Sequence, residues 1–139
     1  MDIGECKSKG FIKVTFPDNN KAKSLLEISD IKEDVIVAVK LDEKSINAYL
    51  PLAYDSLRES LEAFCIQRGF NVTNHVCLGE LVKDLDSEFD FNSFDRFRYA
   101  RNSINYYGKK IGLSEGSIMI KNMFVMRKKI KLKVKDKFV

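Results

Sequence analysis

The chain has few of the residues that interrupt helices, with two prolines and seven glycines in 139 residues. Loop-rich and disordered chains are enriched in both, so this scarcity excludes those classes. The sequence also lacks the roughly 18 consecutive apolar residues of a membrane-spanning helix, and its first residues lack the apolar core of a secretory signal. With 45% hydrophobic residues, we predict a single folded domain in the cytoplasm, without membrane contact.

Cysteine and histidine are also scarce. The three cysteines, Cys6, Cys65 and Cys77, form no Cys-x-x-Cys motif, and their odd number argues against a disulfide scaffold or a zinc knuckle. Cys65 lies in an apolar helical run and is expected in the core. His75 lies near Cys77 without further ligands nearby, so no metal site is predicted. Phosphate-binding glycine loops and Gly-x-Ser-x-Gly elbows are absent too, and no cofactor is predicted.

Charge is distributed unevenly along the chain. Residues 91–139 contain 13 Lys or Arg and 3 Asp or Glu, whereas residues 1–90 contain 11 and 17. Such asymmetry is typical of proteins that bind a polyanion, or of copies that associate through acidic and basic surfaces. A basic helix that faces only water is the alternative.

Hydrophobic residues recur every three or four positions along most of the chain, which predicts helices. The predicted helices span about 20–39, 43–68, 74–85, 94–111 and 118–130. Pro51 should kink the second helix or mark its true start. Residues 113–116 should break the chain, and the residues from 131 onward are either a frayed helix end or a short strand.

These elements predict an all-α fold, an up-down bundle of four or five helices. Residues 11–16 have strand-like composition but no evident partner strand, so they are interpreted as part of an extended arm. The predicted organisation is an N-terminal arm over residues 1–17, a helical bundle over 18–132 and a basic tail over 133–139.

The predicted helix at 94–111 is the most polar one. With about 100° of rotation per residue, it has a buried stripe and a polar strip beside that stripe. The buried stripe would contain Phe97, Ala100, Ile104, Tyr107, Gly108 and Ile111. The polar strip would contain Arg98, Arg101, Asn102, Asn105, Tyr106 and Lys109. Guanidinium and amide groups on one strip either hold a phosphate or form a polar dimer seam.

Several segments, taken in order, resemble the HEPN superfamily (higher eukaryotes and prokaryotes nucleotide-binding), especially its small stand-alone archaeal and other prokaryotic members. The segments are Pro17-Asp18-x-x-Lys21-Ala22-Lys23-Ser24-Leu25-Leu26, Tyr54-Asp55-x-Leu57-Arg58-Glu59-x-Leu61-Glu62-Ala63, Arg68-Gly69-Phe70, Asn74-His75 and Arg101-Asn102-x-Ile104-x-Tyr106-Tyr107-Gly108. The resemblance covers roughly residues 17–130, and it implies a helical bundle that dimerises through the face with the arginine motif.

In active members of that superfamily, an arginine is followed four to six residues later by a histidine, and the pair cleaves RNA without metal. Arg101 and Asn102 match the start of this motif, but Tyr106 and Tyr107 occupy the place of the histidine. Tyrosine has an unperturbed pKa near 10 and is a poor base. The only histidine, His75, is far away in sequence. The motif is therefore degenerate, which favours binding over cleavage.

The first hypothesis is a non-catalytic, dimeric binding module for RNA or nucleotide phosphates. Its binding residues would be Arg98, Arg101, Asn102, Asn105 and Lys109. The resemblance alone implies a nucleotidyltransferase-type partner protein in a toxin–antitoxin-like pair.

Two alternatives stay open. The chain is a metal-independent endoribonuclease in which Arg101, Asn102 and Tyr106 act together. Otherwise it is a purely structural dimerisation protein, in which Glu59 or Glu62 neutralises Arg101. In that second case the two tyrosines after Arg101 are packing residues.

Overall fold

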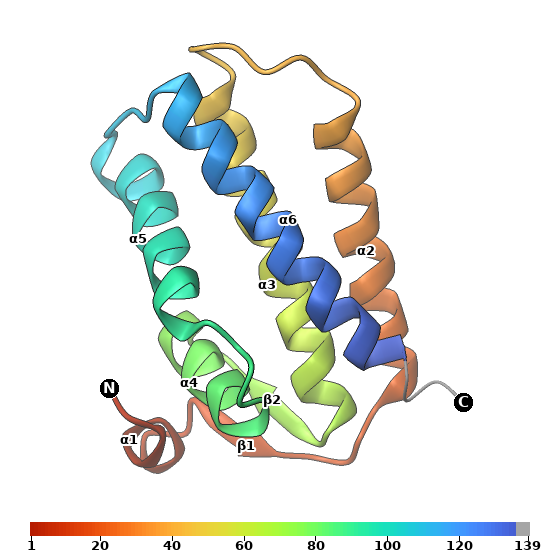
Figure 1. Cartoon of the computed structure of the whole chain (residues 1–139). Helices are drawn as coiled ribbons and strands as arrows, with labels where there is room; N and C mark the ends of the chain where they lie inside the picture. Colours follow the sequence, from red (N-terminus) through yellow and green to blue (C-terminus); the bar gives the residue numbers. More distant parts are fainter. Residues whose placement is uncertain (136–139) are drawn as a thin grey trace.

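The computed structural model describes residues 1–135, which fold into six helices and one small two-stranded sheet. The order is α1 (Ile3–Ser8), β1 (Ile12–Val14), α2 (Asn19–Val37), α3 (Ile46–Gln67), β2 (Phe70–Val72), α4 (His75–Leu85), α5 (Phe91–Tyr107) and α6 (Leu113–Lys135). The long helices form a bundle, with the short elements gathered at its lower end (Figure 1). The predicted all-α bundle with an N-terminal arm is confirmed. None of the helices in residues 1–135 is long and apolar enough to cross a membrane.

The central element of the bundle is α3, against which α2, α4, α5 and α6 all pack (Figure 1). Tyr54, Leu57, Leu61 and Phe64 are among its fully or almost fully buried side chains. A helix that is buried around most of its circumference is typical of a core element. Because α3 starts at Ile46, Pro51 lies inside the helix and does not mark its start.

α6 begins earlier and ends later than the sequence indicates. Residues 113–116 are its first turn, so the predicted chain break there is wrong. Gly116 permits this because a Cβ atom at that position would lie 2.5 Å from Cγ1 of Ile46, and only glycine fits against α3. The helix continues to Lys135 with Val134 buried. The rest of the predicted tail, residues 136–139, lies outside the described part of the chain.

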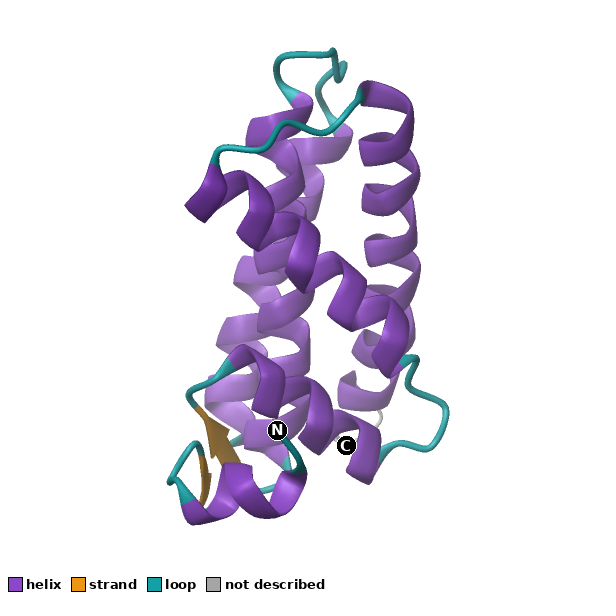
Figure 2. Ribbon diagram, turned by 90° about the vertical axis from the view of Figure 1, so that its left-hand side faces the viewer, coloured by secondary structure: helices purple, strands orange, loops and turns teal. Residues whose placement is uncertain are grey.

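The extended arm predicted near the N-terminus contains a strand. β1 pairs antiparallel with β2, with Ile12 opposite Val72 and Val14 opposite Phe70, so the preference for an unpaired arm is wrong. Figure 2 shows the two strands beside α1. The partner strand was missed because residues 70–72 follow a helix end directly. Gly69 makes this turn with φ of 88°.

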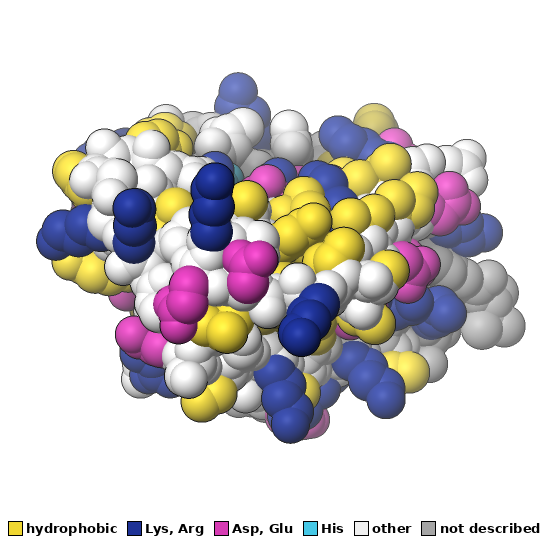
Figure 3. Space-filling model, turned by 90° about the horizontal axis from the view of Figure 1, so that it is seen from above, with side chains coloured by type: hydrophobic (Ala, Val, Ile, Leu, Met, Phe, Trp, Pro, Cys, Tyr) yellow, Lys and Arg dark blue, Asp and Glu magenta, His cyan; other side chains and the backbone are white. Residues whose placement is uncertain are grey.

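Apolar side chains also reach the surface of the helices. Exposed examples are Ile28, Ile31 and Val37 on α2, and Ile118 and Val125 on α6. Seen from above, hydrophobic side chains form a broad area with lysines and arginines around it (Figure 3). The helical pattern therefore does not bury all of its apolar residues in this chain.

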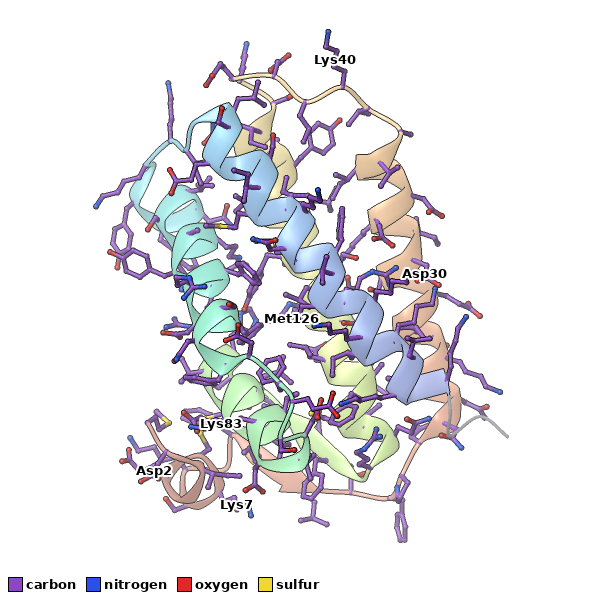
Figure 4. The ribbon with its side chains drawn as sticks, viewed as in Figure 1. Asp2, Lys7, Asp30, Lys40, Lys83 and Met126 are labelled. Atoms are coloured by element: carbon purple, nitrogen blue, oxygen red, sulfur yellow. A yellow bond between two sulfur atoms is a disulfide. The ribbon has the colours of Figure 1, made fainter. Side chains whose placement is uncertain are left out.

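A disulfide joins Cys6 of α1 to Cys77 of α4, with Cα atoms 5.6 Å apart (Figure 4). The odd cysteine count argued against a disulfide scaffold, but it did not reveal this single pair, whose members are 71 residues apart. Cys65 is free and buried, as predicted. Disulfides are rare in the cytosol of most organisms, so the cytoplasmic location stays a prediction.

A buried ion-pair network connects α6 to α2. The Arg127 side chain is only 4% exposed. Its Nη1 donates to Asp30 at 2.7 Å and to Ser29 Oγ at 3.1 Å, and its Nη2 donates to Glu33. Lys131 adds a second cation at 2.8 Å from Asp30, which is labelled on α2 in Figure 4. These bonds fix α6 against α2.

We expect Arg127→Met to lower the free energy of unfolding by about 3 kcal/mol, the lower end of the range for a broken buried ion pair. The lower end applies because Asp30 and Glu33 are partly exposed. Urea unfolding checks this, with the exposed neighbour Lys128→Met as control, which should change the stability by less than about 0.5 kcal/mol. Equal effects of the two substitutions would contradict the network's role.

Removal of the disulfide should also destabilise the fold. For a loop of 71 residues, the chain-entropy model gives about 4 kcal/mol. The double variant Cys6→Ser/Cys77→Ser should therefore melt at a lower temperature than the oxidised protein. Its melting temperature should not respond to a thiol reductant, whereas that of the wild type should fall to the same value. If the reductant did not change the melting temperature of the wild type, the disulfide would contribute nothing to the stability of the fold.

Candidate functional site

The arginine of the predicted motif and the single histidine meet at Tyr54. The hydroxyl of Tyr54 lies 3.3 Å from Nδ1 of His75, and their ring centroids are 5.7 Å apart. Cζ of Arg101 lies 5.7 Å from the centroid of the same tyrosine ring. Three helices, α3, α4 and α5, thus each contribute one group to this place.

Local structure explains how His75 reaches the site. It is the first residue of α4, and the preceding Asn74 caps the helix by accepting a hydrogen bond from the Cys77 N–H at 3.1 Å. The pairing of β2 with β1 sets the direction in which the chain enters α4, and the Cys6–Cys77 disulfide anchors the first turn. The histidine is therefore held at a constrained helix start.

Arg101 is oriented by its own helix. Its Nη1 donates to Asn102 Oδ1 at 3.1 Å and to the Tyr106 hydroxyl at 3.2 Å. The Tyr106 ring also lies under the guanidinium, with its centroid 5.5 Å from Cζ. Such cation–π contact and hydrogen bonding restrict the rotamers of the arginine. The sequence motif is thus one local structural unit.

Within residues 1–135, Arg101 has no carboxylate partner, and its Nε is buried without a hydrogen-bond acceptor. Neutralisation of Arg101 by Glu59 or Glu62 was expected inside one protomer or across a dimer, and the first possibility is wrong. Glu59 pairs with Lys32 at 2.7 Å, and Glu62 pairs with Arg58 at 2.7 Å. A partly buried cation without a carboxylate partner attracts an anion, because its charge is only partly screened by water.

Two further arginines lie near the histidine. Arg58 is one helical turn after Tyr54 on α3, and Arg98 is nearly one turn before Arg101 on α5. Arg58 bonds Glu62, while Nε and Nη2 of Arg98 both donate to Asp95 at 3.0 and 2.8 Å. Their charges are thus partly compensated. We define Arg58, Arg98 and Arg101 as the arginine cluster.

The electrostatic environment keeps the imidazole of His75 neutral. Burial, followed by the positive charges of Arg58 and Arg101, lowers its pKa from 6.5 to about 4. Burial likewise raises the pKa of Tyr54 above its usual value, so the hydroxyl stays protonated at pH 7. A neutral imidazole can accept a proton, while the arginine cluster can hold an anion beside it.

The other residues of the predicted polar strip lie at the end of α5. Asn105 is exposed one turn beyond Arg101. The helix ends at Tyr107 because Gly108 adopts a left-handed conformation with φ of 63°, so Lys109 lies beyond the helix rather than on it. Tyr107 was expected in the buried stripe, but it is 75% exposed. Gly108 is exposed as well, whereas Ile111 is partly buried against the core, so the predicted stripe is wrong at Tyr107 and Gly108 only.

Tyr54, Arg58 and His75 were not predicted to belong to this site. Tyr54 and Arg58 are four residues apart on one helix, which indicates a shared face but not which helix covers that face. Only the packing of α4 and α5 on α3 brings His75 and Arg101 to it. Within residues 1–135, no cluster of His, Cys, Asp and Glu is arranged to hold a metal ion.

No family model, curated protein or solved structure matches this chain. The resemblance to the HEPN superfamily therefore stays a prediction.

The lowered pKa of His75 can be measured directly, because the chain has one histidine. Titration of its Hε1 resonance should give a pKa of about 4. Arg101→Gln should raise the pKa of His75 because it removes a nearby positive charge. Arg96→Gln is the control, since Arg96 is hydrogen-bonded to Ser93, and it should leave the pKa of His75 unchanged. Two equal responses would contradict the electrostatic effect of Arg101 on His75.

The same pKa has a consequence for stability. In the unfolded chain the histidine binds a proton near pH 6.5, whereas in the folded chain it resists protonation down to about pH 4. Protons therefore favour the unfolded state, and stability should fall as the pH drops through this window. His75→Gln should lack this part of the acid sensitivity, which urea unfolding at a series of pH values would show.

Proposed function

We propose that this protein is a HEPN-like, non-catalytic module that binds RNA or nucleotide phosphates through the arginine cluster. One observation carries the proposal. Arg101 is partly buried, has no carboxylate partner among the described residues, and lies beside two other arginines. A phosphate supplies the negative charge that this arrangement lacks.

The orientation of Arg101 suits phosphate binding. Asn102 and Tyr106 hold Nη1, so Nη2 remains as a donor with no bond to any other described residue. Guanidinium groups bind phosphate oxygens strongly because the hydrogen bonds are charge-assisted. Arg98 is one turn away along α5, with its charge partly offset by Asp95, and adds attraction of longer range.

The end of α5 extends the same surface. Asn105 and Lys109 are exposed there, together with Tyr106 and Tyr107. Exposed tyrosines can stack on unpaired bases, and tyrosines are also enriched in protein interfaces. These features support both RNA binding and the proposed homodimer through the α5 face.

A nucleotidyltransferase-type partner in a toxin–antitoxin-like pair is also proposed. It rests only on the resemblance of the motif order to the HEPN superfamily. Two of the segments in that order, residues 54–63 and 101–108, lie near each other through Tyr54 and Arg101. The purely structural dimer stays the alternative without a ligand.

A second candidate function is metal-independent RNA cleavage, favoured by the position of His75. The sequence motif lacks a histidine, but His75 lies beside Tyr54, which Arg101 also contacts. A neutral imidazole could take the proton of a ribose 2′-hydroxyl, whose oxygen would bond to the phosphorus as the bond to the 5′-oxygen breaks. The imidazolium would then return the proton to the 5′-oxygen, while Arg101, oriented by Asn102 and Tyr106, holds the phosphate. The pKa of about 4 makes His75 a weak base, which is why binding is the first proposal.

We expect the protein to bind fluorescein-labelled single-stranded RNA with an affinity that falls as salt rises. Arg101→Gln should weaken the binding and reduce the salt slope by about one. Arg96→Gln, an exposed arginine of the same helix, is the control with the same net charge. Fluorescence anisotropy measures both. Equal losses in the two variants would indicate only general charge attraction, and no binding at low salt would leave the structural alternative.

Cleavage is tested separately with labelled RNA in EDTA. Intact RNA in the presence of bound protein supports the binding module. If cleavage disappears in both Arg101→Gln and His75→Gln, the protein is a nuclease that uses His75 as the base. If cleavage persists in His75→Gln but disappears in Tyr106→Phe, Tyr106 is the base. Cleavage that persists in all three variants would come from a contaminating enzyme.

A further inference from the structure

α2 and α6 both pack on α3, and a groove of about 730 Å³ lies between them. Its walls are mostly apolar, and the α2 wall continues into the connection to α3. The apolar lining includes Ile36, Val37, Leu41, Ile120, Phe124 and Leu132. The groove shares no residue with the arginine cluster, so it is a separate feature of the molecule.

The α6 wall of the groove has a regular pattern. Lys121, Lys128 and Lys135 are seven residues apart, and all three are exposed. Val125 and Leu132, also seven residues apart, are 49% and 57% exposed. A seven-residue spacing keeps residues on one stripe of a helix. The groove therefore has an apolar stripe and a lysine stripe running side by side.

Few negative charges balance these lysines. None of the three forms an ion pair with a carboxylate of residues 1–135. Glu33 is the one acidic residue in the lining, and it is already bonded to Arg127. The groove is thus apolar at its base and positively charged along its α6 edge.

We propose that this groove binds an amphipathic helix of a partner protein, with an apolar face and acidic residues along one edge. Two neighbouring helices form ridges between which a third helix packs. Lys121 and Lys135 are 14 residues apart on α6, or about 21 Å at the rise of an α-helix. A partner helix of about four turns matches the lysine stripe.

The pattern favours this occupant over others. A nucleic acid would be attracted to the lysines but would leave the apolar stripe exposed to water. A lipid surface is flat and does not enter a groove between two helices. A second copy that places α6 on α6 would bring the same lysines together, and such like-charge contact is unfavourable. An amphipathic helix with acidic residues along one edge would cover the apolar stripe and pair with the lysine stripe.

The probe is a labelled synthetic helical peptide with leucines on one face and glutamates beside them, measured by fluorescence anisotropy. A matched peptide with glutamine in place of glutamate tests the charge. We expect the acidic peptide to bind at least about tenfold more tightly. Val125→Gln/Leu132→Gln should weaken binding of the acidic peptide at both low and high salt.

The matched protein variants test the lysine stripe. Lys121→Gln/Lys128→Gln/Lys135→Gln should remove the preference for the acidic peptide. Lys7→Gln/Lys9→Gln/Lys13→Gln removes three exposed lysines near the N-terminus and the same net charge, and should keep the preference. Circular dichroism melting establishes that each variant is folded before its binding is compared.

Several results would overturn the proposal. One is equal binding of the two peptides, and another is equal loss in the two triple variants. If the wild type self-associates in sedimentation and Val125→Gln/Leu132→Gln abolishes this association, the groove binds a second copy of the chain. Binding to phosphatidylserine vesicles in place of the peptide would assign it to lipid. Arg101→Gln should leave peptide binding unchanged, so failure here is distinguishable from failure of the proposed RNA binding.

Discussion

The bundle depends on one buried guanidinium. Arg127 points from α6 into the space beside α2, where Asp30, Glu33 and Ser29 receive its hydrogen bonds. A buried charge without these partners is strongly unfavourable, so α6 has one acceptable position relative to α2. Ser29 in turn bonds the Ser56 carbonyl of α3 at 2.6 Å. One polar network therefore ties together three helices that the hydrophobic effect alone would hold without a defined register.

This constraint also determines which residues α6 presents to solvent. With Arg127 turned inward, Lys121 and Lys128 face outward along the groove. The exposed Val125 follows the same stripe. A helix turned by a few residues would bury lysines and expose core side chains. The buried Arg127–Glu33 pair itself lies in the wall of this groove, so the ion pairs that fix α6 against α2 also fix the surface that could receive a partner.

The arginine site depends on α3 in a comparable way. Tyr54 is buried, its hydroxyl lies beside Nδ1 of His75, and its ring lies beside the guanidinium of Arg101. The helix periodicity predicted the main helices, and the prediction for residues 74–85 is close to α4. The hydrophobic periodicity did not reveal β2, because a strand of three residues directly after a helix is too short to show an alternating pattern. It also extended α5 past Gly108, whose φ of 63° stops the helix, since glycine can both continue and end a helix.

The sequence by itself determined the helical class, the basic second half of the chain and the unit formed by Arg101, Asn102 and Tyr106. These properties depend on residues within one or two helical turns, where spacing decides which side chains share a face. Only the tertiary structure decided that His75 and Arg101 both lie beside Tyr54, that Cys6 bonds Cys77, and that Arg127 is the buried basic residue of α6. Those contacts join segments far apart in the chain. Their formation depends on how whole helices pack, which no local pattern specifies.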